Sequence, residues 1–155
     1  AVPSRAEFEP GFYRWLERLA RIADNIDCRI VFHGRKDTLQ LINVFIRNRH
    51  EGVRAEYADM EHWNELPRLA KEVKEDHLFV IVTARKGTIS YKNAMERIPD
   101  EVNRFFKGKT LMIIFPDQYG ESIDHITLAQ PLHTEEQTAV YDVARKWIYS
   151  KFRRI

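Results

Sequence analysis

The sequence predicts an α/β domain with a parallel sheet of about five strands, helices on both of its faces and an additional C-terminal helix. Two continuous apolar runs, Leu78–Thr83 and Thr110–Phe115, are typical of strands that are buried on both faces. A loop of small residues and one helix, Pro99–Phe106, separate the two runs. Because neighbouring parallel strands need such a crossover, the three segments predict one strand–helix–strand unit.

Helical patterns alternate with short apolar runs in the first half of the chain as well. Residues 1–4 have the pattern of the end of a strand whose beginning is missing. The strand at 53–57 carries charged side chains, so we expect it at an edge of the sheet. The expected elements are, in chain order, a helix after Pro10 and Gly11, the strand Cys28–His33, the helix Thr38–Asn48, the strand Val53–Tyr57 and a helix from Trp63 to Val73 with Pro67 in its first turn.

The chain changes character after Phe115. Residues 116–133 are polar and contain two prolines and a glycine, which indicates an extended connection. Thr134 then begins a capping box, which predicts an amphipathic helix with basic residues in its last turns. We therefore expect an α/β domain over residues 1–116, and a connection with a C-terminal helix over 117–155.

Composition excludes several classes of function. The 155 residues are 44% hydrophobic and 31% charged, enough for one well-filled core. The formal net charge is only +2, so no strong basic field indicates a nucleic-acid partner. The apolar runs are far shorter than the roughly 20 residues that span a bilayer, so we expect no direct membrane insertion of this fragment. A single cysteine, Cys28, excludes an internal disulfide.

The loop that follows the apolar run at 78–83 is the leading candidate site. Ligands of doubly wound sheets bind where the carboxyl end of a strand meets the next helix. Small residues let backbone amides approach a phosphate, two basic residues supply charge, and two hydroxyls supply further donors. The candidate ligand-binding residues in this loop are Ala84, Arg85, Lys86, Gly87, Thr88 and Ser90. The alternative is an ordinary strand–helix connection with solvated basic residues.

The order of strand, small-residue loop, helix and closing strand resembles the second half of the universal stress protein domain, which belongs to the adenine nucleotide alpha hydrolase-like fold. In nucleotide-binding members, the loop carries two glycines and later a Gly-Ser or Gly-Thr pair that meets phosphate. Laid on this chain, those positions fall on Ala84, Gly87 and Arg97-Ile98. Ser4 stands at the end of the first strand, where the family places an acidic residue near adenine or ribose. The resemblance implies ATP or AMP as the ligand, if one binds.

A narrower resemblance adds a cellular context. The phrases AVPSRAEFEPGF, TARKGTISY and IIFPDQYG are similar to the cytoplasmic tails of bacterial monovalent cation:proton antiporters, which carry universal-stress-like domains. This resemblance implies a cytoplasmic domain of an inner-membrane protein, with the membrane antiporter portion of the same polypeptide as its partner. The family also implies a homodimer formed through the closing strand, Thr110–Phe115.

Three other side chains suit a site by residue type or position. His33 lies at the carboxyl end of a strand, where it suits a ligand contact or a pH-sensing group. His62 stands near two acidic residues, Asp59 and Glu61, but has no partner at metal-ligand spacing. Cys28 begins a strand and is best explained as a small buried hydrophobe. We expect no metal site and no catalytic residues.

The leading hypothesis is a non-catalytic regulatory domain of a cation:proton antiporter, which senses a nucleotide or mediates dimerisation. The first alternative is a stand-alone nucleotide-binding universal stress protein. The second is an enzyme of the same α/β nucleotide-hydrolase class that uses the loop at 84–90 as a phosphate cradle. The enzyme needs a general base near the strand ends, and only His33 qualifies by position.

Overall fold

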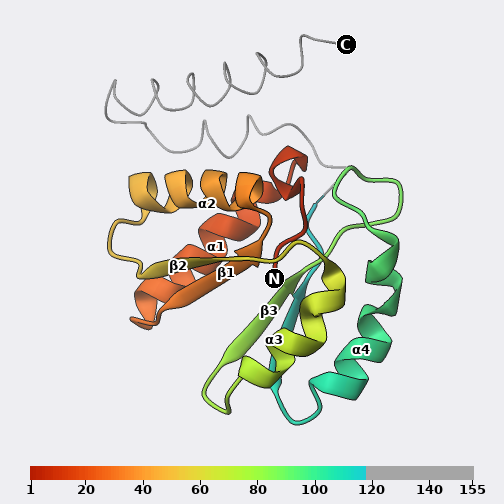
Figure 1. Cartoon of the computed structure of the whole chain (residues 1–155). Helices are drawn as coiled ribbons and strands as arrows, with labels where there is room; N and C mark the ends of the chain where they lie inside the picture. Colours follow the sequence, from red (N-terminus) through yellow and green to blue (C-terminus); the bar gives the residue numbers. More distant parts are fainter. Residues whose placement is uncertain (118–155) are drawn as a thin grey trace. The chain divides into compact units, whose positions relative to one another are not determined.

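The computed structural model describes residues 1–117, which form an α/β arrangement of short parallel strands and helices (Figure 1). None of the helices in this part of the chain is long and apolar enough to cross a membrane. The predicted connection lies outside the described residues except for Pro116 and Asp117, and the predicted C-terminal helix lies entirely outside them. The elements run α1 (Phe12–Asn25), β1 (Ile30–Gly34), α2 (Lys36–Arg49), β2 (Ala55–Asp59), α3 (Leu66–Glu72), β3 (Leu78–Val82), α4 (Ile98–Phe105) and β4 (Thr110–Ile114), with 3-10 turns at Ala6–Phe8, Trp63–Glu65 and Asn93–Arg97.

The strands form two parallel pairs instead of one sheet of five. β1 pairs with β2, and β3 pairs with β4. The prediction of one continuous five-stranded sheet is therefore wrong for the described residues. The reason is local: the segment expected as the first strand contributes only Ala1 and Val2 between the two pairs, which is too short to form a strand of its own.

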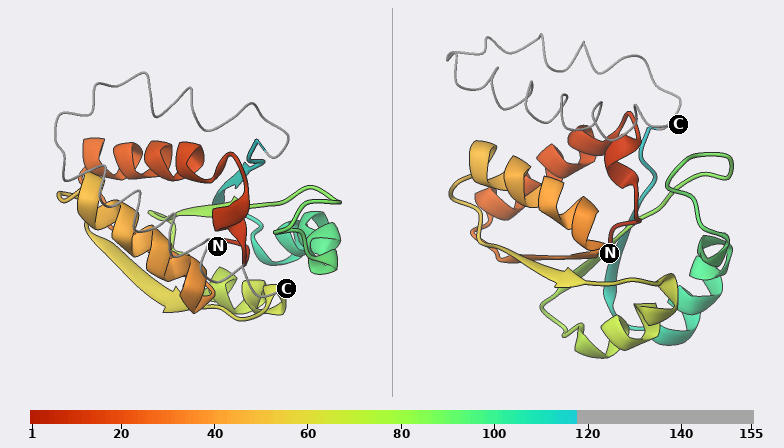
Figure 2. Two further views of the ribbon diagram at one scale, coloured as in Figure 1. Left: turned by 90° about the horizontal axis from the view of Figure 1, so that it is seen from above. Right: turned by 45° about the horizontal axis from the view of Figure 1, so that its top comes forward.

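Ala1 and Val2 nevertheless connect the two pairs by backbone hydrogen bonds. The Val2 N–H donates to the His33 carbonyl of β1 at 2.8 Å, and the Val82 N–H of β3 donates to the Ala1 carbonyl at 2.9 Å. The amino group of Ala1 also donates to the Val80 carbonyl at 2.6 Å. Both views in Figure 2 place the N-terminus among the strands rather than at the periphery. The chain therefore begins at the junction of the two pairs.

Helices cover both faces of the strands, as predicted, and each face has its own core. On one face, α1 and α2 pack through residues such as Phe12, Leu16 and Ile42 against Phe32 and Val82 of the strands. On the other face, α3 and α4 pack against the alternate residues of β3. That second core includes Leu66, Leu69, Phe79, Ile81, Ile98 and Phe106. The alternation follows from the strand period of two, which sends successive side chains to opposite faces.

Apart from the first strand and the C-terminal helix, the predicted helices and strands are found with shifts of one to three residues at their ends, and Pro67 does lie in the first turn of α3. β2 lies at an edge of its pair, as predicted. β4 differs from the prediction of a strand buried on both faces, because Met112 and Ile113 are each 37% exposed. Among the described residues only β3 pairs with β4, so β4 is an edge strand.

Candidate functional site

The loop at 84–90 closes on itself through a turn. The Thr88 hydroxyl donates to the Arg85 carbonyl at 2.7 Å, and the Thr88 N–H donates to the same oxygen at 3.1 Å. Gly87 lies at the tip with φ of 91°, a left-handed conformation that side-chain-bearing residues rarely adopt. One of the two hydroxyls that were expected to meet phosphate is therefore bonded to the loop's own backbone.

The second hydroxyl of the loop binds a buried carboxylate. The N–H and the hydroxyl of Ser90 both donate to Oε1 of Glu9, at 2.9 and 2.7 Å. Ser90 is 1% exposed and Glu9 is 7% exposed, so the contact is inside the protein. An amide and a hydroxyl converging on one anionic oxygen is the pattern expected around a phosphate. Here the anion is part of the chain, and its negative charge opposes a phosphate at the same place.

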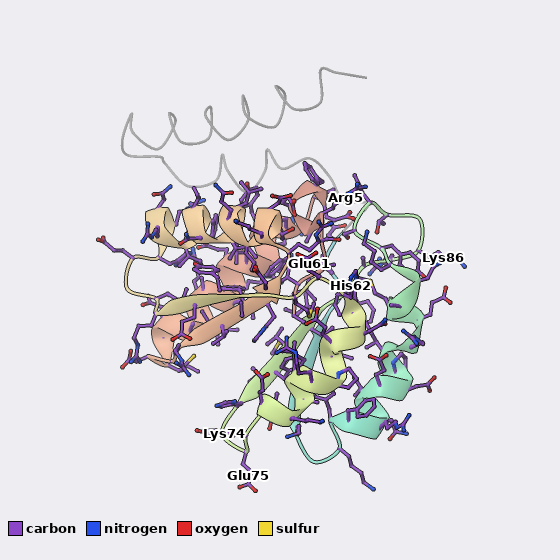
Figure 3. The ribbon with its side chains drawn as sticks, in the orientation of Figure 1. Arg5, Glu61, His62, Lys74, Glu75 and Lys86 are labelled. Atoms are coloured by element: carbon purple, nitrogen blue, oxygen red, sulfur yellow. The ribbon has the colours of Figure 1, made fainter. Side chains whose placement is uncertain are left out.

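The basic residues of the loop point elsewhere. Arg85 and Lys86 are exposed, and the Lys86 ammonium lies 3.6 Å from Glu96. The Tyr91 hydroxyl donates to the same Glu96 carboxylate at 2.6 Å; this bond, and then the charge of Lys86, hold the pKa of Glu96 below its usual value. In Figure 3, Lys86 lies at the periphery, away from Glu61 and His62. Ala84 is packed into the core.

A pocket lined by both polar and apolar residues lies instead beside the carboxyl ends of β1 and β2, next to the N-terminal segment. Its volume is about 450 Å³, within the range of small-molecule sites. We call it the carboxyl-end pocket. Its lining residues are Val2, Ser4, Arg35, Met60, Glu61, His62, Trp63, Asn64, Lys92 and Ala94.

The polar side chains of the carboxyl-end pocket come from four separate segments. Arg35 follows β1 directly and forms an ion pair with Glu61, just after β2, at 3.2 Å. The Glu65 carboxylate accepts the N–H groups of Glu61 and His62 at 2.9 and 3.1 Å, which fixes the backbone there. The bond from the His62 N–H is the main cause that lowers the pKa of Glu65. Figure 3 shows Glu61 and His62 close together at this end of the strands.

Two further groups equip the pocket to bind an anion. Asn64 accepts a hydrogen bond from the Arg97 guanidinium at 2.8 Å through its oxygen, which leaves its amide N–H groups for another acceptor. Lys92 lines the pocket just before the 3-10 turn at 93–97. With Arg35 and Lys92 against the single carboxylate of Glu61, the pocket carries one excess positive charge.

The sequence-predicted site residues are thus divided. Ser4 lines the carboxyl-end pocket, and Arg97 acts on it through Asn64. Ala84, Thr88 and Ser90 are engaged within the loop and core, whereas Arg85, Lys86 and Gly87 are exposed. His33 belongs to β1 and lines the cavity between β1 and β3 rather than the carboxyl-end pocket, and its Nδ1 is buried without a hydrogen-bond partner in the described part of the chain. Burial, and then the nearby N-terminal charge, lower the pKa of His33.

Sequence reasoning missed Arg35, Asn64 and Lys92. Arg35 had a usable signal, because it follows the carboxyl end of a predicted strand, where ligands of parallel sheets bind. Asn64 and Lys92 had none, since only the packing of the 3-10 turns brings them together.

Across residues 1–117, no three side chains of the metal-binding types His, Cys, Asp and Glu converge. No family model, curated protein or solved structure matches this chain.

Proposed function

We propose that the chain is a non-catalytic regulatory domain that binds an adenine nucleotide, AMP or ATP, in the carboxyl-end pocket. The observation that carries this proposal is the convergence of Ser4, Arg35 and Lys92 on one pocket at the carboxyl ends of parallel strands. Ligands bind α/β folds at this end of the strands. Guanidinium, ammonium, hydroxyl and amide groups together suit a phosphate.

The phosphate site in this proposal differs from the one that the family resemblance implies. The 84–90 loop uses its converging donors on Glu9, so the phosphate is assigned to Arg35 and Lys92. The adenine and ribose then lie toward Ser4 and Trp63, the part of the pocket that adjoins the N-terminal segment. Regulation follows if the nucleotide binds one of two arrangements of that segment more tightly than the other.

The cellular part of the proposal rests on the sequence phrases alone. They support a cytoplasmic domain attached to the membrane portion of a monovalent cation:proton antiporter, which the nucleotide would regulate. A stand-alone nucleotide-binding universal stress protein would use the same pocket. Transport measurements distinguish the two hypotheses. If the chain is an antiporter domain, transport by the full-length antiporter should respond to the nucleotide in the wild-type form and lose that response in the Lys92→Ala form.

Thermal unfolding of the purified chain with and without millimolar AMP or ATP tests the nucleotide proposal. A ligand at 100 times its Kd stabilises the folded state by about 2.7 kcal/mol, which moves the midpoint by several degrees. We expect a rise that Lys92→Ala abolishes and that Lys86→Ala, the matched control on the exposed loop, preserves. The proposal is contradicted if neither nucleotide raises the midpoint, or if only Lys86→Ala removes the effect.

A second function is favoured by β4. Its side chains Met112 and Ile113 and the adjoining Phe115, 62% exposed, place apolar surface on a strand edge that no other strand of residues 1–117 pairs with. We propose that a second copy of the chain covers this edge, giving the homodimer that the resemblance implies. Sedimentation of the wild-type chain should show a dimer at micromolar concentration, and Ile113→Lys should shift it to a folded monomer whose thermal midpoint is lower because the dimer no longer stabilises the fold. A wild-type chain that stays monomeric contradicts this proposal.

A further inference from the structure

The two helical faces of the α/β domain differ in charge. α1 and α2 cover one face of the strands (Figure 1), and together they contain six basic and three acidic residues. α3 and α4, which cover the other face, contain three of each. The formal charge is therefore +3 for the first pair of helices and zero for the second. The small net charge of the whole chain conceals this asymmetry, because it sums over all parts of the chain.

The basic residues of the α1 and α2 face lie in two exposed stripes, one on each helix. On α1, Arg14, Arg18 and Arg21 recur at spacings of four and three residues, which places them along one side of the helix. On α2, exposed residues at the same spacings form a second stripe that begins at Lys36 and ends at Arg47. We call the two stripes together the basic face. Its members are Arg14, Arg18, Arg21 and Ile22 of α1, and Lys36, Gln40, Val44 and Arg47 of α2.

The carboxylates of α1 and α2 offset only part of this charge. The Glu17 carboxylate bonds to Arg21 at 2.7 Å. Asp37 follows Lys36 in the first turn of α2, and Asp24 lies in the last turn of α1, beyond the end of the stripe. The basic face therefore keeps an excess of positive charge along most of its length.

Three cations of the basic face form no ion pair in the part of the chain that the structure describes; they are Arg18, Lys36 and Arg47. Arg14 lies 3.7 Å from the Asp117 carboxylate, which is too far for a hydrogen bond. On the opposite face, by contrast, Arg68 of α3 bonds to both Glu65 and Glu72, at 3.0 and 3.1 Å. The basic face thus has charge that an external partner can use.

Helix stability alone does not explain where these cations lie. Arg14 and Arg18 are like charges four residues apart, a spacing that weakens a helix. Arg14 also lies in the first turn of α1, and Lys36 is the first residue of α2. The helix dipole disfavours positive charge at both of these positions. An anionic partner bound to the basic face would offset these local costs.

We propose that the basic face binds the surface of a bilayer that contains anionic lipids. Its cations extend over about 10 Å of α1 and about 16 Å of α2, which matches a flat field of phosphate groups better than a single phosphate. Ile22 and Val44, 42% and 40% exposed, lie among the cations and can enter the boundary between head groups and acyl chains. A nucleic acid offers no such apolar layer. This inference rests on neither the nucleotide pocket nor the β4 dimer.

Flotation of the full chain with lipid vesicles tests the proposal. Vesicles of phosphatidylcholine with about 30% phosphatidylglycerol are compared with vesicles of phosphatidylcholine alone, because only the first carry a negative surface potential. We expect the wild-type chain to bind only the anionic vesicles. Most of this binding should be lost when NaCl is raised from about 50 mM to about 300 mM, since salt screens exposed charges.

Two matched charge reversals locate the binding surface. One variant combines Arg18→Glu with Arg47→Glu on the basic face; the control combines Lys71→Glu with Arg104→Glu, exposed on α3 and α4, and has the same net charge. Because each cation near an anionic leaflet increases partition about fivefold, the first variant should bind about 25-fold more weakly and the control less than about threefold. All other basic residues are the same in wild-type and variant chains.

Three results would overturn the proposal. The first is a wild-type chain that does not bind the anionic vesicles at low salt, and the second is an equal loss of binding in the two variants. The third is a DNA duplex that displaces the wild-type chain from the vesicles, because the basic face would then bind nucleic acid. Thermal midpoints establish that the variants are folded, and Arg18→Gln with Arg47→Gln replaces the charge reversal if that variant unfolds.

Discussion

The two cavities beside the N-terminal segment differ in chemistry although they share a wall. Val2 lines both of them. The carboxyl-end pocket presents Ser4, Arg35 and Lys92, whereas the cavity between β1 and β3 is lined mainly by apolar residues such as Val31 and Leu78. The first cavity lies where strands end and loops begin, and polar groups can gather there. The second lies along the strands, where side chains face two apolar cores. The position of a cavity along the strands therefore decides whether polar groups or apolar side chains line it.

The largest expected effect comes from placing a charge on the shared wall itself, compared with a charge placed in the carboxyl-end pocket. Val2→Asp buries a carboxylate in a core position that is 3% exposed, and we expect a loss of about 4 kcal/mol in the free energy of unfolding. Ser4→Asp makes the same change in the half-buried, polar pocket beside Arg35, and should cost less than about 0.5 kcal/mol. Urea unfolding of both variants measures the difference. Equal losses would mean that the two cavities do not differ as described.

A smaller effect is expected from the charge at the junction. The amine of Ala1 titrates near 8 when unfolded and near 5 in the fold, so the unfolded state binds more protons between these pH values. The stability of the chain beginning at Ala1 should therefore rise from pH 5 to pH 8. Acetylation of Ala1 keeps one N–H for Val80 and removes the charge, so at pH 6 it should stabilise the fold by about 2.5 kcal/mol.

The contribution of the amine to stability must also be distinguished from that of its titratable neighbour, His33. His33, whose pKa is lowered as well, contributes in the same direction but only as pH falls through its own range. The acetylated chain retains the part of the His33 contribution that comes from burial, so the difference between the two chains reports the amine and its charge interaction with His33. Stability measured by urea unfolding at pH 6 and pH 8.5 should differ between the chains only at pH 6. A constant difference would contradict a buried amine.

The sequence predicted the elements well because their signals are local. The apolar stripe of α1 and the continuous run of β3 each specify an element within a few residues. The failures involve long-range packing. Ser90 meets Glu9 across 81 residues, and no local pattern connects them. The prediction of a single five-stranded sheet was wrong because the strand end at residues 1–4 was counted as a full strand, whereas only Ala1 and Val2 bond to the neighbouring strands.

The sequence-predicted site residues are divided for the same reason. Ser4 lines the carboxyl-end pocket because it follows Val2 at the carboxyl ends of the strands, a position that a local pattern can indicate. The 84–90 loop has the composition of a phosphate cradle, but composition cannot show that Glu9 already satisfies its donors. Lys92 was missed because it belongs to the pocket only through the turn at 93–97.

The most direct measurement is a titration of the isotope-labelled chain with AMP, followed through backbone amide chemical shifts. If the nucleotide binds in the carboxyl-end pocket, the largest shifts will occur at Ser4, Asn64 and Lys92, and Gly87 and Thr88 will change little. The largest shifts at Gly87 and Thr88, or no saturable shift at millimolar AMP, would contradict the proposed site.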